Sequence, residues 1–245
     1  MHKIDIHAHY GTWSCDPSDC SSVDDLRKLL DKYEIEKCIL SSAKAIIYDI
    51  EEGNKEVDDI LKADKRLYGS VVFNPNYKEK SLKQLERYLD NPRFVSMKNH
   101  PDYTAQEINS KSNLEILEKF HSAPLTLHTM GRARIDAGVE IAKRYPAMPV
   151  FFFHMGCPDW EHAVKAAKDV PNIMFEAVAS NAERGRIKKA VDVLGAERMF
   201  FGTDLTLLDP AYVIGMFEES GFLQSQKELI YYSNAKRIFF EKRGI

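Results

Sequence analysis

The sequence has little of several features that would indicate particular classes of protein. Its four cysteines are too few for the disulfide framework of a small secreted domain. No run of apolar residues is long enough to cross a membrane, and no apolar signal segment follows the first residues. We therefore expect a cytoplasmic protein that has no membrane as a partner.

An excess of charge of one sign is missing as well. Lys and Arg together number 34 against 37 for Asp and Glu, a net charge of -3, and the basic residues form no block. A clustered basic surface is typical of proteins that bind a nucleic-acid backbone. We therefore expect a small-molecule substrate and no nucleic acid. The oligomeric state stays open, and a homo-oligomer is possible.

What the sequence does contain is a regular alternation of short apolar strands and helical segments. Strands that alternate with helices in this way predict βαβ units and a parallel sheet. A chain of 245 residues with eight such strands has the size of a closed (β/α)8 barrel. An open doubly wound sheet is the alternative, but no glycine-rich phosphate loop follows the first strand. The predicted fold is α/β, a single TIM-barrel domain over residues 1–245.

Reactive side chains recur where the predicted strands end. These strands lie within Met1–Gly11 and at Lys37–Ser42, Leu67–Phe73, Arg93–Asn99, Pro124–Met130, Pro149–Met155, Ile173–Ala179 and Met199–Asp204. The carboxyl ends of all strands in a parallel barrel meet at one mouth, where barrel enzymes have their active sites. The side chains expected at this mouth are those of His7, His9, Lys98, His128, His154 and Asp204.

The first strand carries the clearest of these signals. His7 and His9 alternate with apolar residues, so they share one face of an extended chain and could hold one metal ion. Asp5 lies one layer below, where it could orient an imidazole or pair with a buried lysine. A single histidine at a strand end is more often structural. Its recurrence at several strand ends of one barrel makes a metal centre the better interpretation.

The motifs resemble the amidohydrolase superfamily, and within it the amidohydrolase-related branch of predicted metal-dependent TIM-barrel hydrolases. The matching segments are I-D-I-H-A-H, M-K-N-H-P, L-T-L-H-T-M-G, F-F-F-H-M-G, F-F-G-T-D and S-N-A-K-R-I-F. They occur in the order of the family along the whole chain, but they specify no substrate. The resemblance implies a centre of one or two divalent metal ions, most often Zn2+, that activates water.

The resemblance also implies roles for individual residues. His7, His9 and Asp204 would bind one metal ion. His128 and His154 would bind a second ion, or His128 would join the first set and His154 would act on the substrate. The implied reaction is hydrolysis of an amide, cyclic amide, lactone or ester. Asp204 would move the proton of the attacking water, and His154, where it is not a ligand, would stabilise the oxyanion.

Lys98 stands where the binuclear members carry a carbamylated lysine that bridges both ions, although a mononuclear branch does without it. Carbamylation needs an unprotonated amine, and burial can supply one by lowering the pKa of a lysine. Otherwise Lys98 would neutralise the acidic mouth or bind an anionic substrate. His100, Arg132 and Arg134 are candidates for substrate contact, since arginine offers a bidentate fork to a carboxylate or phosphate. The alternative for both arginines is a solvated loop charge.

Two other reactions stay open. Some relatives in the same branch use these ligands for the non-oxidative decarboxylation of an unsaturated or aromatic carboxylic acid, a lyase reaction. A TatD-like metal-dependent deoxyribonuclease has a similar length. That branch has a glutamate where this chain has Lys98, and the chain has no basic patch, which makes the nuclease the weaker alternative.

Overall fold

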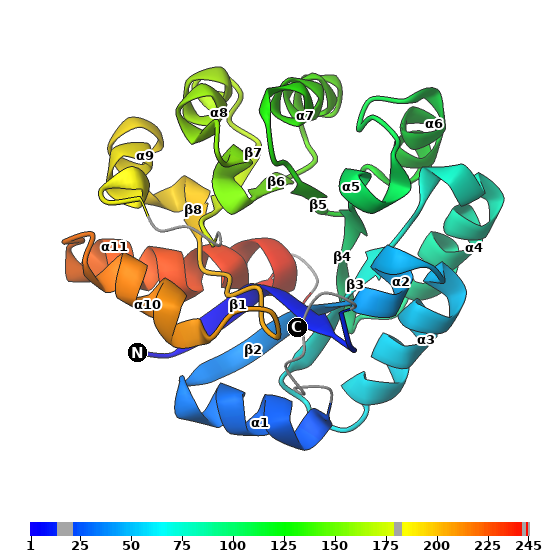
Figure 1. Ribbon diagram of the computed structural model, residues 1–245, viewed down its shortest axis with the longest axis horizontal. Helices are drawn as coiled ribbons and strands as arrows, with labels where there is room; N and C mark the ends of the chain where they lie inside the picture. Colours follow the sequence, from blue (N-terminus) through cyan, green and yellow to red (C-terminus); the bar gives the residue numbers. More distant parts are fainter. Residues whose placement is uncertain (14–21, 179–182, 242–243, 245) are drawn as a thin grey trace.

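The computed structural model is a barrel of parallel strands inside a ring of helices, seen end-on in Figure 1. It describes residues 1–13, 22–178, 183–241 and 244. The eight strands lie side by side in chain order, which confirms the predicted TIM barrel. They are β1 (Lys3–Tyr10), β2 (Ile35–Ser42), β3 (Leu67–Val72), β4 (Phe94–Asn99), β5 (Leu125–His128), β6 (Val150–Phe153), β7 (Ile173–Glu176) and β8 (Met199–Phe200).

Helices connect the strands and cover the outside of the barrel (Figure 1). The α-helices are α1 (Val23–Lys32), α2 (Ala43–Ile47), α3 (Ile50–Leu61), α4 (Lys78–Leu89), α5 (Pro101–Thr104), α6 (Lys111–Phe120), α7 (Arg132–Arg144), α8 (Trp160–Ala167), α9 (Arg186–Leu194), α10 (Pro210–Glu218) and α11 (Gln224–Glu228). Shorter or wider helical turns are η1 (Pro75–Tyr77), η2 (His154–Gly156), η3 (Ala196–Arg198), η4 (Leu229–Ser233) and η5 (Lys236–Phe240). Side chains cap several helices; the Ser22 hydroxyl, for example, accepts a hydrogen bond from Asp25 N at the start of α1.

The C-terminal segment η5 closes the barrel at one end. The ring of Phe239 lies 5.0 Å from that of Phe151, and the ring of Phe240 lies 4.7 Å from that of Tyr68. Phe151 and Tyr68 stand near the beginnings of their strands, and Ile4 of β1 belongs to the same apolar cluster. Burial of such rings stabilises the fold by roughly 1.5–3 kcal/mol each. The opposite end, where the strands finish, is left for polar side chains.

The last strand is shorter than predicted. A strand was expected over Met199–Asp204, but β8 ends at Phe200, and Asp204 itself has a left-handed backbone with φ of 56°. The chain beyond β8 nevertheless runs beside β1, since Thr203 N and Asp204 N both donate to His7 O at 3.2 and 2.7 Å. These bonds complete the barrel and bring Asp204 next to the first strand.

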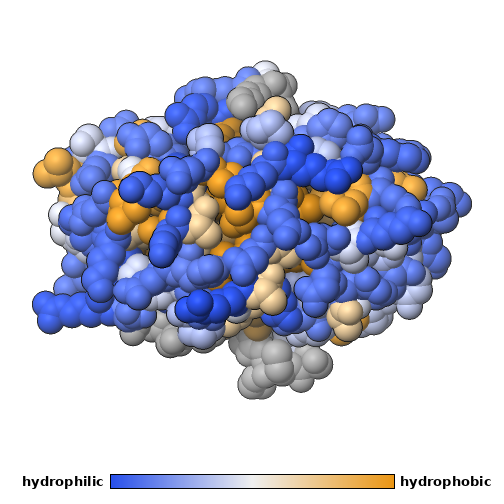
Figure 2. Space-filling model, turned by 90° about the horizontal axis from the view of Figure 1, so that it is seen from above, coloured by the Kyte–Doolittle hydropathy of each residue, from blue (hydrophilic) through white to orange (hydrophobic). Residues whose placement is uncertain are grey.

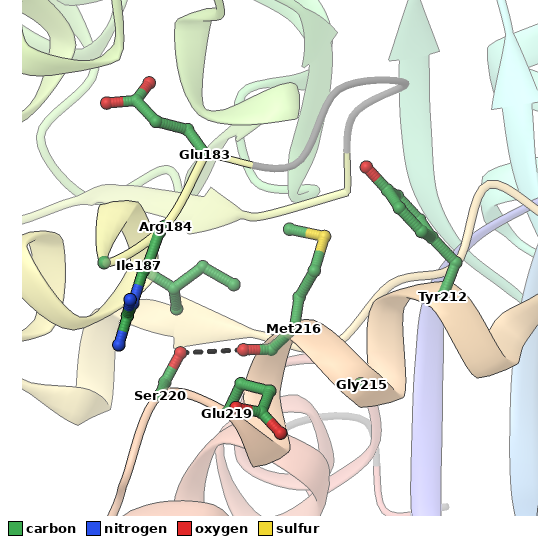
Figure 3. Close-up of a pocket in the computed structure, with 9 residues that line it drawn as sticks. Glu183, Arg184, Ile187, Tyr212, Gly215, Met216, Glu219 and Ser220 are labelled. Carbon is green, nitrogen blue, oxygen red and sulfur yellow. Dashed lines mark hydrogen bonds between the residues drawn. The ribbon is translucent and has the colours of Figure 1, made fainter.

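The outer surface is mostly hydrophilic, with apolar side chains gathered in the middle of the face shown in Figure 2. A hollow of about 430 Å3 lies between α9 and α10 and is lined by residues that include Arg184, Tyr212 and Met216 (Figure 3). Cys38 and Cys157 are buried free thiols, and the other two cysteines lie outside the described residues. Among the described residues no helix combines the length and the apolar character that a membrane span needs.

Candidate metal centre

The mouth of the barrel brings His7, His9 and Asp204 together, as the sequence predicts. All three side chains are buried. Asp204 Oδ1 lies 3.1 Å from His9 Nε2 and 3.4 Å from His7 Nε2. Ligand atoms that sit about 2.0–2.1 Å from a tetrahedral ion are about 3.3–3.4 Å from one another. Both nitrogens therefore lie at ligand spacing from the carboxylate, and the three ligand atoms lie within 4.8 Å of one another, close enough to share one divalent ion.

Two side chains at the mouth stand on left-handed backbone. The φ angles are 65° at His154 and 56° at Asp204, a conformation that costs a residue with a side chain on the order of 1–2 kcal/mol. Hydrogen bonds hold both turns, because His154 N donates to Glu176 Oε2 at 3.4 Å and Asp204 N donates to His7 O. The same turn ends β6 at Phe153, earlier than predicted. This strained backbone turns the side chains of His154 and Asp204 at the strand ends.

Each of four histidines is oriented through its Nδ1 atom by a neighbouring element. The hydrogen-bonded pairs are His7 with Glu176 Oε2 at 2.8 Å, His9 with Ser41 Oγ at 2.9 Å and His154 with Val178 O at 2.9 Å. His128 Nδ1 lies 2.5 Å from Asp102 Oδ2, a close contact that lacks the alignment of a hydrogen bond. When a neutral imidazole donates its Nδ1 proton to such an acceptor, its Nε2 atom keeps a lone pair. This is the form in which histidine binds a metal ion, and the partner at Nδ1 fixes the ring. His9 differs in the metal-free protein, because its Nε2 atom faces Asp204 Oδ1 at 3.1 Å and the hydrogen bond between them needs a proton on Nε2.

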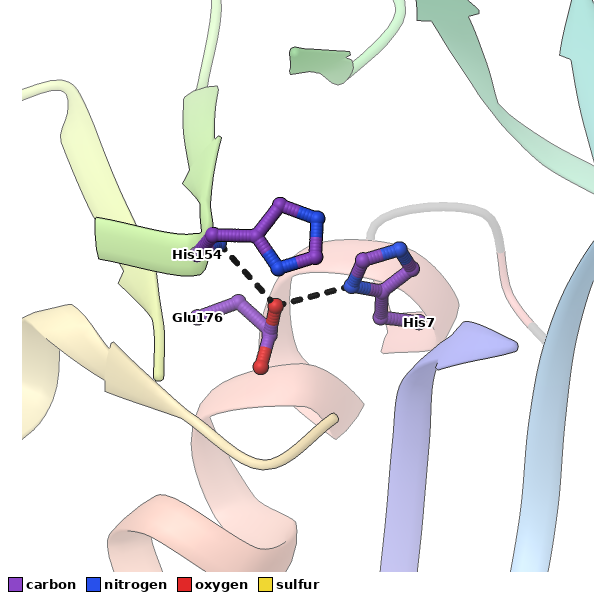
Figure 4. Close-up of side chains that lie close together, drawn as sticks. All are labelled: His7, His154 and Glu176. Atoms are coloured by element: carbon purple, nitrogen blue, oxygen red, sulfur yellow. Dashed lines mark hydrogen bonds and ion pairs between the residues drawn. The ribbon is translucent and has the colours of Figure 1, made fainter. Parts of the chain in front are cut away.

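Glu176 is the residue that the sequence analysis missed. Its fully buried carboxylate lies between the ring of His7 and the backbone of His154 (Figure 4). It also accepts a hydrogen bond from Val178 N. The available signal was an acidic residue at the end of an otherwise apolar strand, I-M-F-E at 173–176. Burial raises the pKa of Glu176 well above its usual value, and the hydrogen bonds from Val178 N and His154 N oppose that rise without cancelling it.

Asp5 does not orient an imidazole, in contrast to one of its two predicted roles. Its carboxylate accepts hydrogen bonds from His7 N at 3.0 Å, Thr203 N at 3.1 Å and Thr203 Oγ1 at 2.5 Å. These contacts join β1 to the segment that follows β8. Asp5 therefore supports the centre through the backbone, and none of the lysines in the described part of the chain pairs with it, which was the predicted alternative.

Lys98 enters the centre from the end of β4. Its Nζ atom lies 3.3 Å from His7 Nε2 and 4.3 Å from the centroid of the Phe153 ring, and the residue is 1% exposed. Burial lowers the pKa of Lys98 to about 8, while the negative charges of Asp204 and Glu176 work in the opposite direction. The amine is therefore protonated in most molecules at pH 7, and a fraction is free to react.

Burial also governs the charge of the other groups. It lowers the pKa of His7 well below its usual value and that of His154 to about 3. Burial by itself would raise the pKa of Asp204, but the hydrogen bond and charge of His9 and further cationic neighbours bring it to about 2. Neutral imidazoles next to an ionised carboxylate are what metal ligation requires.

His100 and His128 form a stacked pair beside the centre. Their rings lie 3.9 Å apart at an angle of 17°, and the ring of His128 is 4.6 Å from that of His154. His100 was predicted as a loop residue that reaches the substrate, and the structure places it, buried, directly before α5. Asp102 of α5 is the Nδ1 partner of His128 and also pairs with an arginine, Arg134.

The two arginines predicted to contact substrate point to different partners. Arg132 Nε lies 3.0 Å from Asp159 Oδ1 before α8, and its side chain is 68% exposed. Arg134 Nη1 lies 2.5 Å from Asp102 Oδ1, and its side chain is 29% exposed. Arg134, and not Arg132, is therefore the arginine that is connected to the histidine cluster.

A model of the amidohydrolase family matches residues 49–240 of the sequence. The chain belongs to the amidohydrolase family. This membership confirms the resemblance predicted from the motifs. The spacing of His7, His9 and Asp204 fits the divalent metal ion that the resemblance implies. No curated protein matches this amidohydrolase-family chain.

Solved structures with the same barrel include both decarboxylases and hydrolases. 2,6-Dihydroxybenzoate decarboxylase from Rhizobium has 15% sequence identity and a TM-score of 0.76, over 98% of this chain and 99% of that chain. Dihydroxybenzoic acid decarboxylase from Polaromonas sp. JS666, solved with manganese and 2-nitroresorcinol, has 16% identity and a TM-score of 0.77, over 97% and 96%. A probable 2-pyrone-4,6-dicarboxylic acid hydrolase from Acinetobacter baumannii, solved with citric acid, has 16% identity and a TM-score of 0.74, over 98% and 99%. At these identities the likeness shows the fold alone.

Proposed function

We propose that this amidohydrolase-family chain is a metal-dependent hydrolase that acts on a carbonyl group, in an amide, cyclic amide, lactone or ester. The observation that supports it is the convergence of His7 Nε2, His9 Nε2 and the Asp204 carboxylate at the spacing of a single coordination sphere. Imidazole and carboxylate are ligands that Zn2+ and similar ions take in open catalytic sites. A bound ion would polarise the carbonyl and make water acidic near neutral pH.

The surrounding residues then have complementary tasks. Asp204 is ionised and would take the proton of the attacking water. His154 donates its Nδ1 proton to Val178 O, so the neutral ring presents a lone pair and is suited to bind a proton or a metal rather than to donate to an oxyanion. We assign the oxyanion to Lys98, whose ammonium group lies 3.3 Å from His7 Nε2 in a buried setting where a charge acts strongly.

We propose that one ion occupies the centre. Two further groups of acids and histidines among the described residues have suitable spacing, but each has another explanation. In one of them Glu176 already accepts two backbone N–H groups. In the other the rings of His100 and His128 are nearly parallel, so their in-plane lone pairs do not converge. A carbamate on Lys98, which would bridge two ions, is not needed for this arrangement.

Decarboxylation of an unsaturated or aromatic carboxylic acid is the second candidate. It is favoured by the solved structures of two dihydroxybenzoate decarboxylases on the same fold, one of them with manganese. That reaction needs a proton for the carbon that loses CO2, and Lys98 would be the donor at the mouth. Hydrolysis remains the first choice because Asp204 is ionised beside the proposed ion, where it can take the proton of a water molecule.

Metal analysis of the purified protein with a substrate screen tests the proposal. We expect one equivalent of divalent metal per chain, lost in a His7→Ala/His9→Ala variant and kept in His162→Ala, a matched control at a partly exposed histidine outside the mouth. The screen follows hydrolysis of esters, lactones and amides beside CO2 release from aromatic acids. Metal binding that survives in the double variant would refute the centre, and CO2 release without hydrolysis would select the decarboxylase.

A further inference from the structure

A chain of charged contacts runs from helix α7 to the histidine at the end of β5. Arg134 Nη1 lies 2.5 Å from Asp102 Oδ1, and Asp102 Oδ2 lies 2.5 Å from His128 Nδ1. Arg134 Nη1 also donates to Met130 O at 3.2 Å, which ties the guanidinium to the segment after β5. The carboxylate of Asp102 is therefore held from one side and presents its second oxygen to the imidazole.

We infer that Asp102 and Arg134 are positioning residues, which fix the ring of His128 and keep its proton on Nδ1. A carboxylate at Nδ1 orients a histidine and makes its Nε2 atom a stronger ligand or base. The contact of 2.5 Å places a negative carboxylate against Nδ1, which favours a proton on that nitrogen although the two groups are not aligned as a hydrogen bond. The arginine in turn prevents Asp102 from turning away into solvent, since the side chain of Asp102 is 34% exposed.

The geometry distinguishes this role from a second metal site. His100 Nδ1, His128 Nδ1 and an Asp102 oxygen lie within 4.8 Å of one another, which is close enough for a shared ion by distance alone. A metal ion, however, lies about 2.0–2.1 Å from each imidazole nitrogen and in the plane of each ring. Rings stacked 3.9 Å apart at 17° have no such common point. His100 packs against His128 and limits its tilt.

Nitrogen-15 NMR of histidine in the metal-free protein tests the inference independently of activity. In the wild type we expect the His128 signals of the tautomer protonated on Nδ1, and in Asp102→Asn a mixture of both tautomers. Arg134→Gln, which leaves Asp102 in place, should give an intermediate result and serves if Asp102→Asn folds poorly. Asp136→Asn is the matched control, because it removes the partner of a histidine outside the mouth, His162, at 2.6 Å.

Zn2+ titration against a chromophoric chelator supplies the second readout. Asp102→Asn should weaken Zn2+ binding about 10- to 100-fold where His128 is a further ligand of the ion, and should leave it unchanged where His128 acts on the substrate instead; Asp136→Asn should leave it unchanged in both cases. An unchanged His128 tautomer in Asp102→Asn would overturn the inference, as would the loss of a whole second equivalent of Zn2+, which would make Asp102 a ligand. This readout rests on the proposed function. A tautomer change in a protein that never binds metal would support the positioning role and refute the function.

Discussion

Replacing Glu176 by glutamine is the most specific test of how the centre is held. The carboxylate accepts on both oxygens: Oε2 faces His7 Nδ1 and His154 N, and Oε1 faces Val178 N. A glutamine of the same shape accepts on one oxygen only. Whichever way the amide turns, its NH2 group therefore faces at least one buried N–H group, and the wild-type pattern cannot be restored.

The size of the effect follows from these contacts. A buried N–H group without an acceptor costs about 1–3 kcal/mol of stability. If the amide NH2 turns toward His7, it also favours a proton on Nε2, where the metal would bind, and loss of such a support weakens metal binding about 10- to 100-fold, or about 1.4–2.7 kcal/mol. Ser41→Ala removes the neutral partner of His9 and should weaken binding less, because a charged acceptor holds an imidazole more strongly.

Two measurements on the same samples separate the possibilities. Urea unfolding of the metal-free protein gives the change in stability, and competition with a chelator gives the change in Zn2+ affinity. We expect Glu176→Gln to lower both, and Ser41→Ala to lower the affinity by a smaller factor. A variant that loses stability but binds Zn2+ as tightly as the wild type would show that Glu176 only fills the core. If Glu176→Gln had the same stability and the same Zn2+ affinity as the wild type, the tautomer argument would be refuted.

Two further predictions concern the charge and the packing of the barrel. The pKa of His154 is about 3 in the folded protein and about 6.5 in the unfolded chain, so as the pH falls below 6.5 the unfolded chain binds a proton that the folded one does not. Between pH 7.5 and 5.5 the wild type should therefore lose about 1.4 kcal/mol relative to His154→Gln in denaturant unfolding; parallel pH curves would contradict the burial of a neutral ring. Phe239→Ala should cost about 3–5 kcal/mol, because this ring closes the barrel against Phe151, and an unfolding midpoint close to that of the wild type would show that η5 is dispensable.

Much of the fold, and the positions of His7, His9, Lys98 and Asp204 at the mouth, could be predicted from the sequence. Short apolar strands at regular spacing specify a parallel barrel, and a parallel barrel brings every strand end to one mouth. His7, His9 and Lys98 needed nothing more than their position at a strand end to be placed correctly. Asp204 was also placed correctly, although the strand predicted to carry it ends four residues earlier and its own turn is left-handed.

The hydrogen-bond partners of the histidines could not be predicted, because they depend on the register between strands. Glu176 is 169 positions from His7 in the sequence, and only the relative height of β7 and β1 decides that the two side chains meet. Local pattern instead favoured Asp5, which is two residues away but binds backbone amides. A backbone carbonyl, that of Val178, has no sequence signal at all, yet it decides which nitrogen of His154 keeps its lone pair.

The arginines show the same limit at the scale of one helix. Both were expected in a loop, where either could turn to the mouth, but α7 begins at Arg132 itself. Successive residues of a helix are rotated by about 100°, so residues two apart point in nearly opposite directions. Arg132 accordingly reaches Asp159 and Arg134 reaches Asp102. The position of a helix start, which patterns locate only to within one or two residues, thus decides which charge is linked to His128 and which is left in solvent.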